Sequence, residues 1–256
     1  MSNQDYLKVA IQAAKEAAPT FIKYFGKAGK AKIKNDNPRD LVTQADLQIE
    51  RMIRKNILKA FPNSKIIGEE FAHSKLKEKD IVWIIDPIDG TTNFIQGLPN
   101  CGISIALWRG QNPQVGVVYN PITKELFTAQ KGQGAKLNGK KIEVSQTKKI
   151  GLAYGGFGWG RDIAWAAKNF PTVLPKLHKI RTLGSTAIEL CKVAERIYDF
   201  QIQGRIKIWD FAAAATILTE AGGKLTDFSG RPVSLATTQL IASNSKIHKE
   251  LLKIIK

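Results

Sequence analysis

The sequence predicts a layered α+β or α/β sandwich in which helices pack on two sheets. Three observations favour this fold class: helical periodicity opens the chain, a series of β-branched runs follows, and the second half alternates short apolar runs with helical segments. The chain has 256 residues, of which 43% are hydrophobic, so a core of ordinary size can form without disulfides. We expect one domain over 1–256, built from two intimate subdomains of roughly 1–145 and 146–256.

The first half reads as two helices followed by a strand-rich meander. Residues 4–25 place apolar side chains on one helical face. Thr43 and Asp46 have the spacing of a capping box at the start of a second helix, which Phe61 and Pro62 end. The runs expected to be strands are 64–68, 81–85, 101–108, 115–119 and 125–129.

The second half alternates strands and helices. The expected strands are 151–154, 179–181 and 197–203, and the expected helices are 161–169, 185–194 and 211–221. Residues 155–160, GGFGWG, do not match the G-x-G-x-x-G fingerprint and lack its paired acidic residue. We therefore expect residues 155–160 to form a flexible loop near the mouth of the functional site.

The charge balance admits several kinds of partner. Against 39 Lys and Arg stand 22 Asp and Glu, a formal net charge of +17, which fits nucleic acid, an anionic membrane surface or a phosphorylated substrate. The lysines are scattered, as on solvated faces, and no RNA-binding aromatic motif accompanies them. No apolar run approaches the roughly 20 residues that span a bilayer, and no secretion signal opens the chain, so we expect a cytoplasmic protein that does not bind membranes.

The cysteines and histidines exclude two kinds of chemistry. Cys101 and Cys191 form no C-x-x-C pair and are expected to be reduced core residues. Four residues separate Cys191 from Arg196, one fewer than in the Cys-x5-Arg loop of cysteine-dependent phosphatases. The three histidines match no zinc-binding spacing, so any metal must be held by oxygen ligands.

The most informative segment is 83–94, WIIDPIDGTTNF. It places Asp86 and Asp89 three residues apart around a proline, after a buried strand, so both carboxylates can face one point. Residues 90–92, GTT, can open a helix whose free N–H groups accept phosphate. A simple turn with a capping threonine is the structural alternative. The segment lacks the D-x-D signature of enzymes that form an aspartyl-phosphate, so Asp86 is interpreted as a metal ligand.

Two further acidic elements point to the same chemistry. Glu69 and Glu70 follow a short strand, and Asp210 lies at the start of a helix. Each has a plain interpretation by itself, the pair as a solvated turn and Asp210 as an N-cap. Together with the aspartates of 83–94 they suggest one oxygen-rich metal site.

These residues resemble the inositol monophosphatase family. The resemblance rests on Gly68-Glu69-Glu70, on segment 83–94, on Trp209-Asp210-Phe-Ala-Ala and on Glu220-Ala-Gly-Gly223. It extends from 40 to 223 with the right order and spacing. It implies an αβαβα sandwich and a magnesium-dependent hydrolysis of a phosphate monoester, typically inhibited by lithium.

The resemblance implies a set of metal ligands. Glu69, Asp86 and the backbone carbonyl of Ile88 would hold one Mg²⁺, and Asp86, Asp89 and Asp210 would hold a second. A third, weaker ion would involve Glu69 and water. Hard carboxylate oxygens suit Mg²⁺, which keeps several waters and shares phosphate oxygens of the substrate.

The resemblance also implies catalytic and substrate-binding residues. Glu69 and Thr91 would orient the attacking water, and Asp46 would assist Thr91. The other ion would stabilise the leaving oxygen. The implied substrate contacts are Gly90, Thr91, Thr92, Gly184, Ser185, Thr186, Gln203 and Asp210.

One position departs from the family and opens the substrate question. Family members commonly carry Glu seven residues before the motif aspartate, where this chain has Gln203. Gln can bond hydroxyl groups but has no charge, and Arg205 and Lys207 lie nearby in sequence. We expect myo-inositol 1-phosphate as substrate, with fructose 1,6-bisphosphate or 3′-phosphoadenosine 5′-phosphate as alternatives.

Two expectations concern partners. The resemblance implies the homodimer usual in the family. Some bacterial relatives act in RNA or transcription assemblies, so a binding role in such an assembly is the alternative to catalysis, and the charge of +17 permits it.

Overall fold

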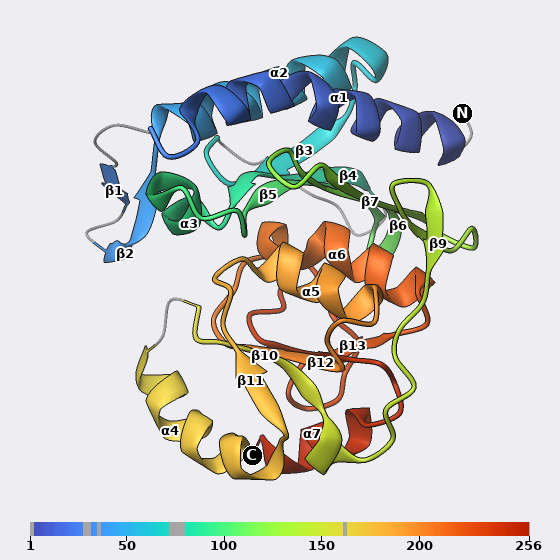
Figure 1. Ribbon diagram of the computed structural model, residues 1–256. Coiled ribbons are helices and arrows are strands. Elements are labelled where there is room, and N and C mark those ends of the chain that lie inside the picture. Colours follow the sequence, from blue (N-terminus) through green and yellow to red (C-terminus); the bar gives the residue numbers. More distant parts are fainter. Residues whose placement is uncertain (1–2, 28–31, 35–36, 72–79, 161–162, 256) are drawn as a thin grey trace.

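The structure is a computed structural model that describes residues 3–27, 32–34, 37–71, 80–160 and 163–255. It has five layers, in which helices cover both outer faces of two sheets and fill the space between them (Figure 1). The chain starts in the outer helical layer beside the first sheet and ends beside the second (Figure 1). The predicted layered sandwich, in its αβαβα form, is confirmed.

Helices α1 (Asn3–Tyr24) and α2 (Gln44–Ala60) form the first layer and run side by side over the first sheet (Figure 1). Their apolar faces are buried: Phe21 in α1 and Ile49 and Ile53 in α2 are fully inaccessible. The expected capping box is present, because the Thr43 N–H donates to Asp46 Oδ2 at 2.8 Å. This bond fixes the first turn of α2.

The first sheet has the strand order β3-β4-β5-β6-β7-β8-β9. Its strands are β3 (Lys65–Gly68), β4 (Ile81–Asp89), β5 (Gly102–Arg109), β6 (Asn112–Asn120), β7 (Glu125–Gln130), β8 (Ala135–Leu137) and β9 (Lys140–Ile142). Strand β3 is parallel to β4, and the others form the expected antiparallel meander. One expectation was wrong: β4 continues past Ile85 to Asp89, with an irregularity in its pairing between Asp86 and Asp89.

The middle layer consists of α5 (Thr186–Ala194) and α6 (Ile208–Glu220), which belong to the second half of the chain but pack on the first sheet. Close approach is possible because small residues face each other there. A β-carbon on Gly116 would lie 2.2 Å from the Ala213 carbonyl oxygen, and Trp108 Nε1 donates to the Ala212 carbonyl at 3.2 Å. The first and second halves therefore share one core, and their division at 145 stays a prediction.

The second sheet has the order β11-β10-β12-β14-β13. Its strands are β10 (Tyr154–Gly158), β11 (Lys179–Arg181), β12 (Phe200–Gln203), β13 (Lys224–Thr226) and β14 (Leu240–Ser243). The expectation of a strand at 151–154 and a loop at 155–160 was wrong, since Ile150–Leu152 is a 3₁₀ turn and the glycine-rich residues form β10. Strand β10 is parallel to both β11 and β12.

Helices α4 (Ile163–Val173) and α7 (His248–Ile254) cover the outer face of the second sheet (Figure 1). The expected helix at 161–169 is thus longer, and its first two residues lie outside the described part. Three short elements complete the fold: the hairpin β1 (Lys32–Lys34) and β2 (Asn37–Val42), and the helix α3 (Thr91–Gln96). The motif residues 90–92 therefore open a helix, as predicted.

The acidic residue of the Glu220-Ala-Gly-Gly223 motif joins two layers. Glu220, at the end of α6, accepts the N–H groups of Gly132 and Gly134 with its two oxygens, both at 2.9 Å. These glycines lie in the turn between β7 and β8, so the carboxylate holds a hairpin of the first sheet against the middle layer. This motif residue has a structural role.

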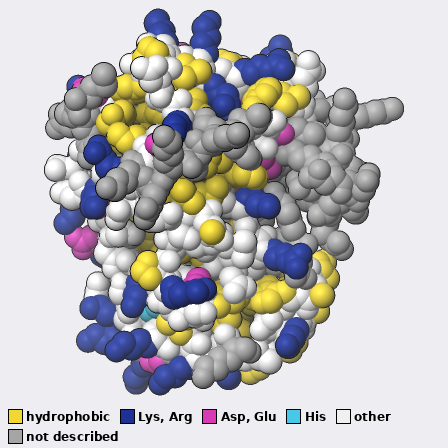
Figure 2. Space-filling model, turned by 180° about the vertical axis from the view of Figure 1, so that it is seen from behind, with side chains coloured by type: hydrophobic (Ala, Val, Ile, Leu, Met, Phe, Trp, Pro, Cys, Tyr) yellow, Lys and Arg dark blue, Asp and Glu magenta, His cyan; other side chains and the backbone are white. Residues whose placement is uncertain are grey.

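The surface charge is spread out. Figure 2 shows Lys and Arg side chains over the upper, left and lower parts of the visible face, mixed with other side chains. No helix of the described residues is long and apolar enough to cross a membrane.

Candidate active site

The candidate site is a cavity of about 680 Å³ that lies where the first sheet, the middle helices and the second sheet meet. It is lined by the end of β4, by the segments that follow β10, β11 and β12, and by the first residues of α3, α5 and α6. Ligands of open α/β sheets bind outside the carboxyl ends of strands, and helix N-termini favour anions. The fold thus prepares this cavity for a negatively charged ligand.

Four acidic side chains predicted as metal ligands line this one cavity. They are Glu69 after β3, Asp86 and Asp89 in β4, and Asp210 in α6. Asp86 and Asp89 are 2% and 6% exposed. Burial raises the pKa of Asp86 well above its usual value, and the negative charges of the other three raise it further. Burial also raises the pKa of Asp89, to about 7.

The irregular end of β4 orients its own groups. Asp86 Oδ1 accepts the Ile88 N–H at 3.0 Å, and the Thr91 hydroxyl donates to the Ile88 carbonyl at 3.1 Å. The predicted carbonyl ligand therefore lies in a turn that joins the aspartate to the threonine of α3.

Asp89 is held by the start of α5. Its Oδ2 accepts the Ser185 hydroxyl and the Ala187 N–H, the latter at 2.8 Å. Ser185 is the N-cap of α5 and only 1% exposed. Its hydroxyl thus orients a predicted metal ligand, and this contact joins β4 of the first sheet to the middle layer.

Asp210 lies inside the first turn of α6. The helix begins at Ile208, earlier than the expected 211, so Asp210 is its third residue. One oxygen, Oδ2, accepts the Lys207 N–H at 2.7 Å. The interpretation of Asp210 as a plain N-cap is therefore wrong, although its carboxylate does satisfy a helix N-terminal donor.

A carboxylate that the sequence analysis missed supports the Glu69 turn. Glu50 of α2 is fully buried, and its Oε2 accepts the Glu70 N–H at 2.8 Å while its Oε1 pairs with Arg54 at 2.8 Å. A β-carbon on Gly68 would lie 1.9 Å from Glu50 Oε1, so glycine is needed there. In sequence, Glu50 and Arg54 look like an ordinary i,i+4 surface pair, so no signal could have singled them out.

Two acidic residues that the sequence analysis singled out lie outside the cavity lining. Of the described residues, Glu69 lines the cavity, whereas Glu70 and Asp46 do not. Asp46 is fully buried and accepts the N–H and hydroxyl of Thr43. Its assistance to Thr91 stays a prediction.

The residue types at the cavity fit a divalent cation. Buried carboxylates raise one another's pKa there, and a dication relieves that repulsion. Within the described residues, no three His, Cys, Asp or Glu side chains already form a closed set around one point. Mg²⁺ keeps several waters and takes phosphate oxygens of the substrate, so the three aspartates predicted for the second cation would reach it partly through water.

The phosphate end of the cavity is built on α3. Gly90 has φ of 85° and a β-carbon there would lie 2.9 Å from the Asn100 carbonyl oxygen, so this turn requires glycine. Thr91 and Thr92 start the helix and line the cavity. Asn93, whose role sequence reasoning missed, donates to the carbonyls of Asn100 and Leu183 at 2.7 and 2.6 Å.

The cavity is completed by the segments that follow β10, β11 and β12 and by the start of α5. Gly184, Thr186 and Gln203 line it as predicted. Arg205 also lines it, and its side chain is exposed, whereas Lys207 is exposed but lies outside the lining. Trp159, 44% exposed, contributes an apolar rim.

Glu189 of α5 is a further lining residue that the sequence analysis missed. It is 1% exposed, and burial raises the pKa of its carboxyl to about 8, against the hydrogen bond from the Leu183 N–H and with help from the charge of Asp89. A cation beside Asp89 would offset that charge and lower this pKa.

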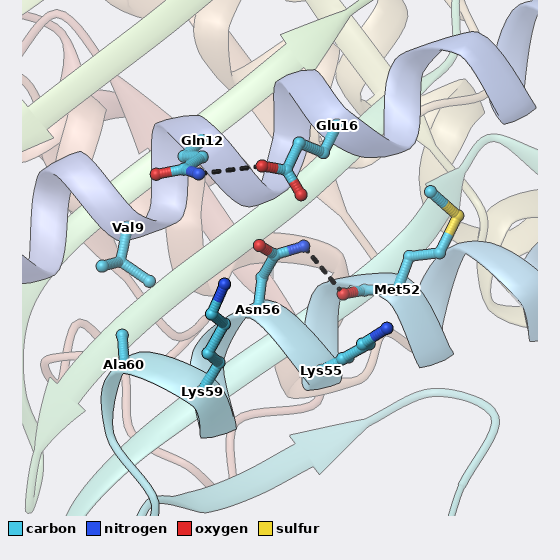
Figure 3. Close-up of a pocket in the computed structure, with 8 residues that line it drawn as sticks. All are labelled: Val9, Gln12, Glu16, Met52, Lys55, Asn56, Lys59 and Ala60. Atoms are coloured by element: carbon cyan, nitrogen blue, oxygen red, sulfur yellow. Dashed lines mark hydrogen bonds between the residues drawn. The ribbon is translucent and has the colours of Figure 1, made fainter.

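A second hollow, of about 550 Å³, lies between α1 and α2 (Figure 3). Two of its polar side chains donate within their own helices: Gln12 donates to Glu16 at 2.8 Å, and Asn56 donates to the Met52 carbonyl at 3.1 Å (Figure 3). Glu16 is the single carboxylate among the described residues that line it. This hollow offers no acidic cluster, so the candidate site is the first cavity.

Known proteins resemble the chain over almost its whole length. A profile described as the inositol monophosphatase family matches residues 2–256. "Fructose-1,6-bisphosphatase/inositol-1-monophosphatase" of Aquifex aeolicus is 36% identical over 98% of this chain and 95% of its own. "Nus factor SuhB" of Pasteurella multocida is also 36% identical, over 97% and 95%. A solved structure, the IMPase of Thermotoga maritima, is similar with a TM-score of 0.90 and 35% identity, covering 98% of this chain and 96% of that one.

Proposed function

The chain belongs to the inositol monophosphatase family of phosphoric monoester hydrolases, and from this premise we propose that it hydrolyses myo-inositol 1-phosphate with Mg²⁺. The observation that carries the proposal is that the four predicted metal ligands line one cavity, next to the start of α3. Families of this kind are generally metal-dependent, and the donor set here suits magnesium.

The proposed mechanism assigns each side of the cavity one task. Glu69, Asp86 and the Ile88 carbonyl, which line the cavity, would hold one cation, and Asp86, Asp89 and Asp210 would hold the other. When bound, such ions supply an activated water and positive charge at the leaving oxygen.

The protein's own groups supply orientation. Glu69 and the Thr91 hydroxyl orient the attacking water, and the first N–H groups of α3 bind the phosphate oxygens. The Ser185 hydroxyl keeps Asp89 in place during the displacement. No side chain is phosphorylated, because water attacks phosphorus in line with the departing alcohol.

The alcohol part of the substrate meets Gln203 and the exposed Arg205. Positive charge at this end supports fructose 1,6-bisphosphate or 3′-phosphoadenosine 5′-phosphate as alternative substrates.

A panel of phosphate esters at fixed Mg²⁺ tests the substrate proposal. Phosphate release from inositol 1-phosphate, fructose 1,6-bisphosphate and 3′-phosphoadenosine 5′-phosphate is measured as kcat/KM. We expect release from inositol 1-phosphate. A nucleotide turned over about 100-fold faster would replace it as the substrate, since that ratio equals about 2.8 kcal/mol of transition-state binding.

A second candidate function is a binding role in a transcription assembly. The observation in its favour is the relative named "Nus factor SuhB", 36% identical, together with the net charge of +17. The variant Asp89→Asn separates the two functions in cells that depend on this chain. Loss of the cellular role together with hydrolysis favours the enzyme, and a retained role favours the assembly.

We further propose a cytoplasmic homodimer inhibited by lithium, on the family resemblance alone. Light scattering during size-exclusion chromatography measures the assembly: twice the chain mass of 28.3 kDa supports the dimer, and the single mass removes it.

A further inference from the structure

A row of three buried polar side chains leads from α5 across the second sheet to the cavity. They are Glu189, Gln201 and Gln203, which are 1%, 0% and 4% exposed. Gln201 and Gln203 lie two residues apart in β12, so they share one face of the sheet. Gln201 Nε2 donates to Glu189 Oε2 at 3.2 Å and to Gln203 Oε1 at 3.0 Å.

Two glycines of β10 make room for these amides. Gly156 is paired with Gln201, and Gly158 with Gln203. A β-carbon on Gly156 would lie 1.7 Å from Gln201 Oε1, and one on Gly158 would lie 1.9 Å from Gln203 Oε1. The glycine-rich run that reads as a loop in the sequence is therefore a strand whose missing side chains leave space for the glutamines. Both amides therefore lie directly over the glycines of β10.

The hydrogen bonds define which group donates and which accepts at each contact along this row. Glu189 Oε1 accepts the Leu183 N–H at 2.8 Å, and Glu189 Oε2 accepts the N–H of Gln201. Gln201 donates at both contacts, and Gln203 uses its oxygen to accept. An amide has one oxygen and one NH₂ group, so the NH₂ group of Gln203 is left for the cavity that this residue lines.

In this arrangement Gln201 Oε1 is buried and has no hydrogen-bond partner within the described part of the chain. An unsatisfied buried acceptor destabilises the fold, and native cores contain few of them. Such a group is expected where the other end of the amide has a function.

We propose that Gln201, anchored by Glu189, is a positioning residue that fixes the Gln203 amide with its NH₂ group toward the cavity, and that the site thereby favours phosphate monoesters whose alcohol carries a second anionic group. The inference rests on the proposed phosphatase function and deepens its substrate choice: inositol 1-phosphate is hydrolysed, and the bisphosphorylated alternative has the higher kcat/KM. Arg205 at the same end of the cavity adds positive charge. An NH₂ group bonds an anionic oxygen more strongly than a neutral hydroxyl.

The test compares kcat/KM for fructose 1,6-bisphosphate with that for inositol 1-phosphate, and uses p-nitrophenyl phosphate as a measure of the hydrolytic step itself. The variants are Gln203→Glu and Gln201→Met, which removes the amide at similar length. Gln133→Met, in an exposed turn away from the cavity, is the matched control.

We expect Gln203→Glu to lower the bisphosphate preference about tenfold, because a carboxylate repels the second phosphate. Gln201→Met should lower it several-fold through a higher KM for the bisphosphate, with kcat for p-nitrophenyl phosphate within about twofold of wild type. In the Gln203→Glu background the same change should have a smaller effect, which demonstrates coupling between the two positions.

An unchanged preference in a folded Gln201→Met variant overturns the inference. If that variant does not fold, Glu189→Gln replaces it, since it keeps the shape and alters the anchor, and an unchanged preference there has the same meaning. Wild-type protein that releases phosphate from none of the three esters removes the proposed function itself. If wild-type protein releases phosphate but substitutions at Gln201 and Glu189 leave the bisphosphate preference unchanged, only this inference is overturned.

Discussion

The variant Asp86→Asn is expected to lose phosphate release by roughly 10³-fold or more while it raises the melting temperature of the cation-free protein. Asp86 is the carboxylate assigned to both cations, so its loss removes charge stabilisation at both ends of the displacement. The same carboxylate is 2% exposed, and neighbouring carboxylates raise its pKa. Removing a buried, repelled charge stabilises the fold.

Both effects are measured on the same preparation. Each 1 kcal/mol of relief raises the melting temperature of a chain of this size by about 2–4 °C. Scanning calorimetry in EDTA and phosphate release in Mg²⁺ are therefore compared for wild type and Asp86→Asn. A variant that loses both activity and stability would show that Asp86 supports the fold and would contradict its assignment as a ligand.

Stability of the cation-free protein should also depend on pH at this site. The folded pKa of Asp89 is about 7, raised first by burial, whereas an unfolded Asp has a pKa of about 3.9. Folded Asp89 therefore stays protonated to a higher pH than unfolded Asp89. Its contribution to the free energy of unfolding is complete below about pH 4 and is lost as the pH rises through about 7. The gain in melting temperature on adding Mg²⁺ should accordingly be larger at pH 8 than at pH 6.

The second large effect is expected from Glu69→Gln, with Glu70→Gln as its matched control. Glu69 lines the cavity, where it is assigned to one cation and to the attacking water, whereas Glu70 does not line it. We expect about a 10²- to 10⁴-fold lower kcat for Glu69→Gln, the range of general acid–base catalysis, and less than about a threefold change for Glu70→Gln. The measurement is phosphate release at saturating Mg²⁺. Equal losses in the two variants would contradict the assignment of Glu69.

The sequence predicted the elements that have strong periodicity. The first two helices, the capping box of Thr43 and the antiparallel meander all follow from local patterns. The strand β10 was missed, because glycines 155, 156 and 158 suggest a loop in sequence. Only the partner strand explains them, since Phe200, Gln201 and Gln203 fill the space that the three glycines leave.

The candidate site was predictable in part for a similar reason. The four predicted metal ligands lie in short motifs, so the sequence could suggest them. Glu50 and Asn93 act through contacts with distant segments, Glu50 with the turn after β3 and Asn93 with Leu183, and Glu189 reaches Leu183 across the start of α5. No sequence pattern singles out these contacts, because they depend on how the helices pack against the sheets.

Metal-dependent hydrolysis at the acidic cavity is tested by the initial rate of phosphate release as a function of Mg²⁺ concentration, for wild type and Asp89→Asn. We expect no release in EDTA and a wild-type rate that saturates with Mg²⁺. For Asp89→Asn we expect either a half-saturating Mg²⁺ concentration raised at least about tenfold or a rate that stays at background. Release by wild type that continues in EDTA, or an Asp89→Asn curve that coincides with that of wild type, would contradict metal-dependent hydrolysis at this cavity.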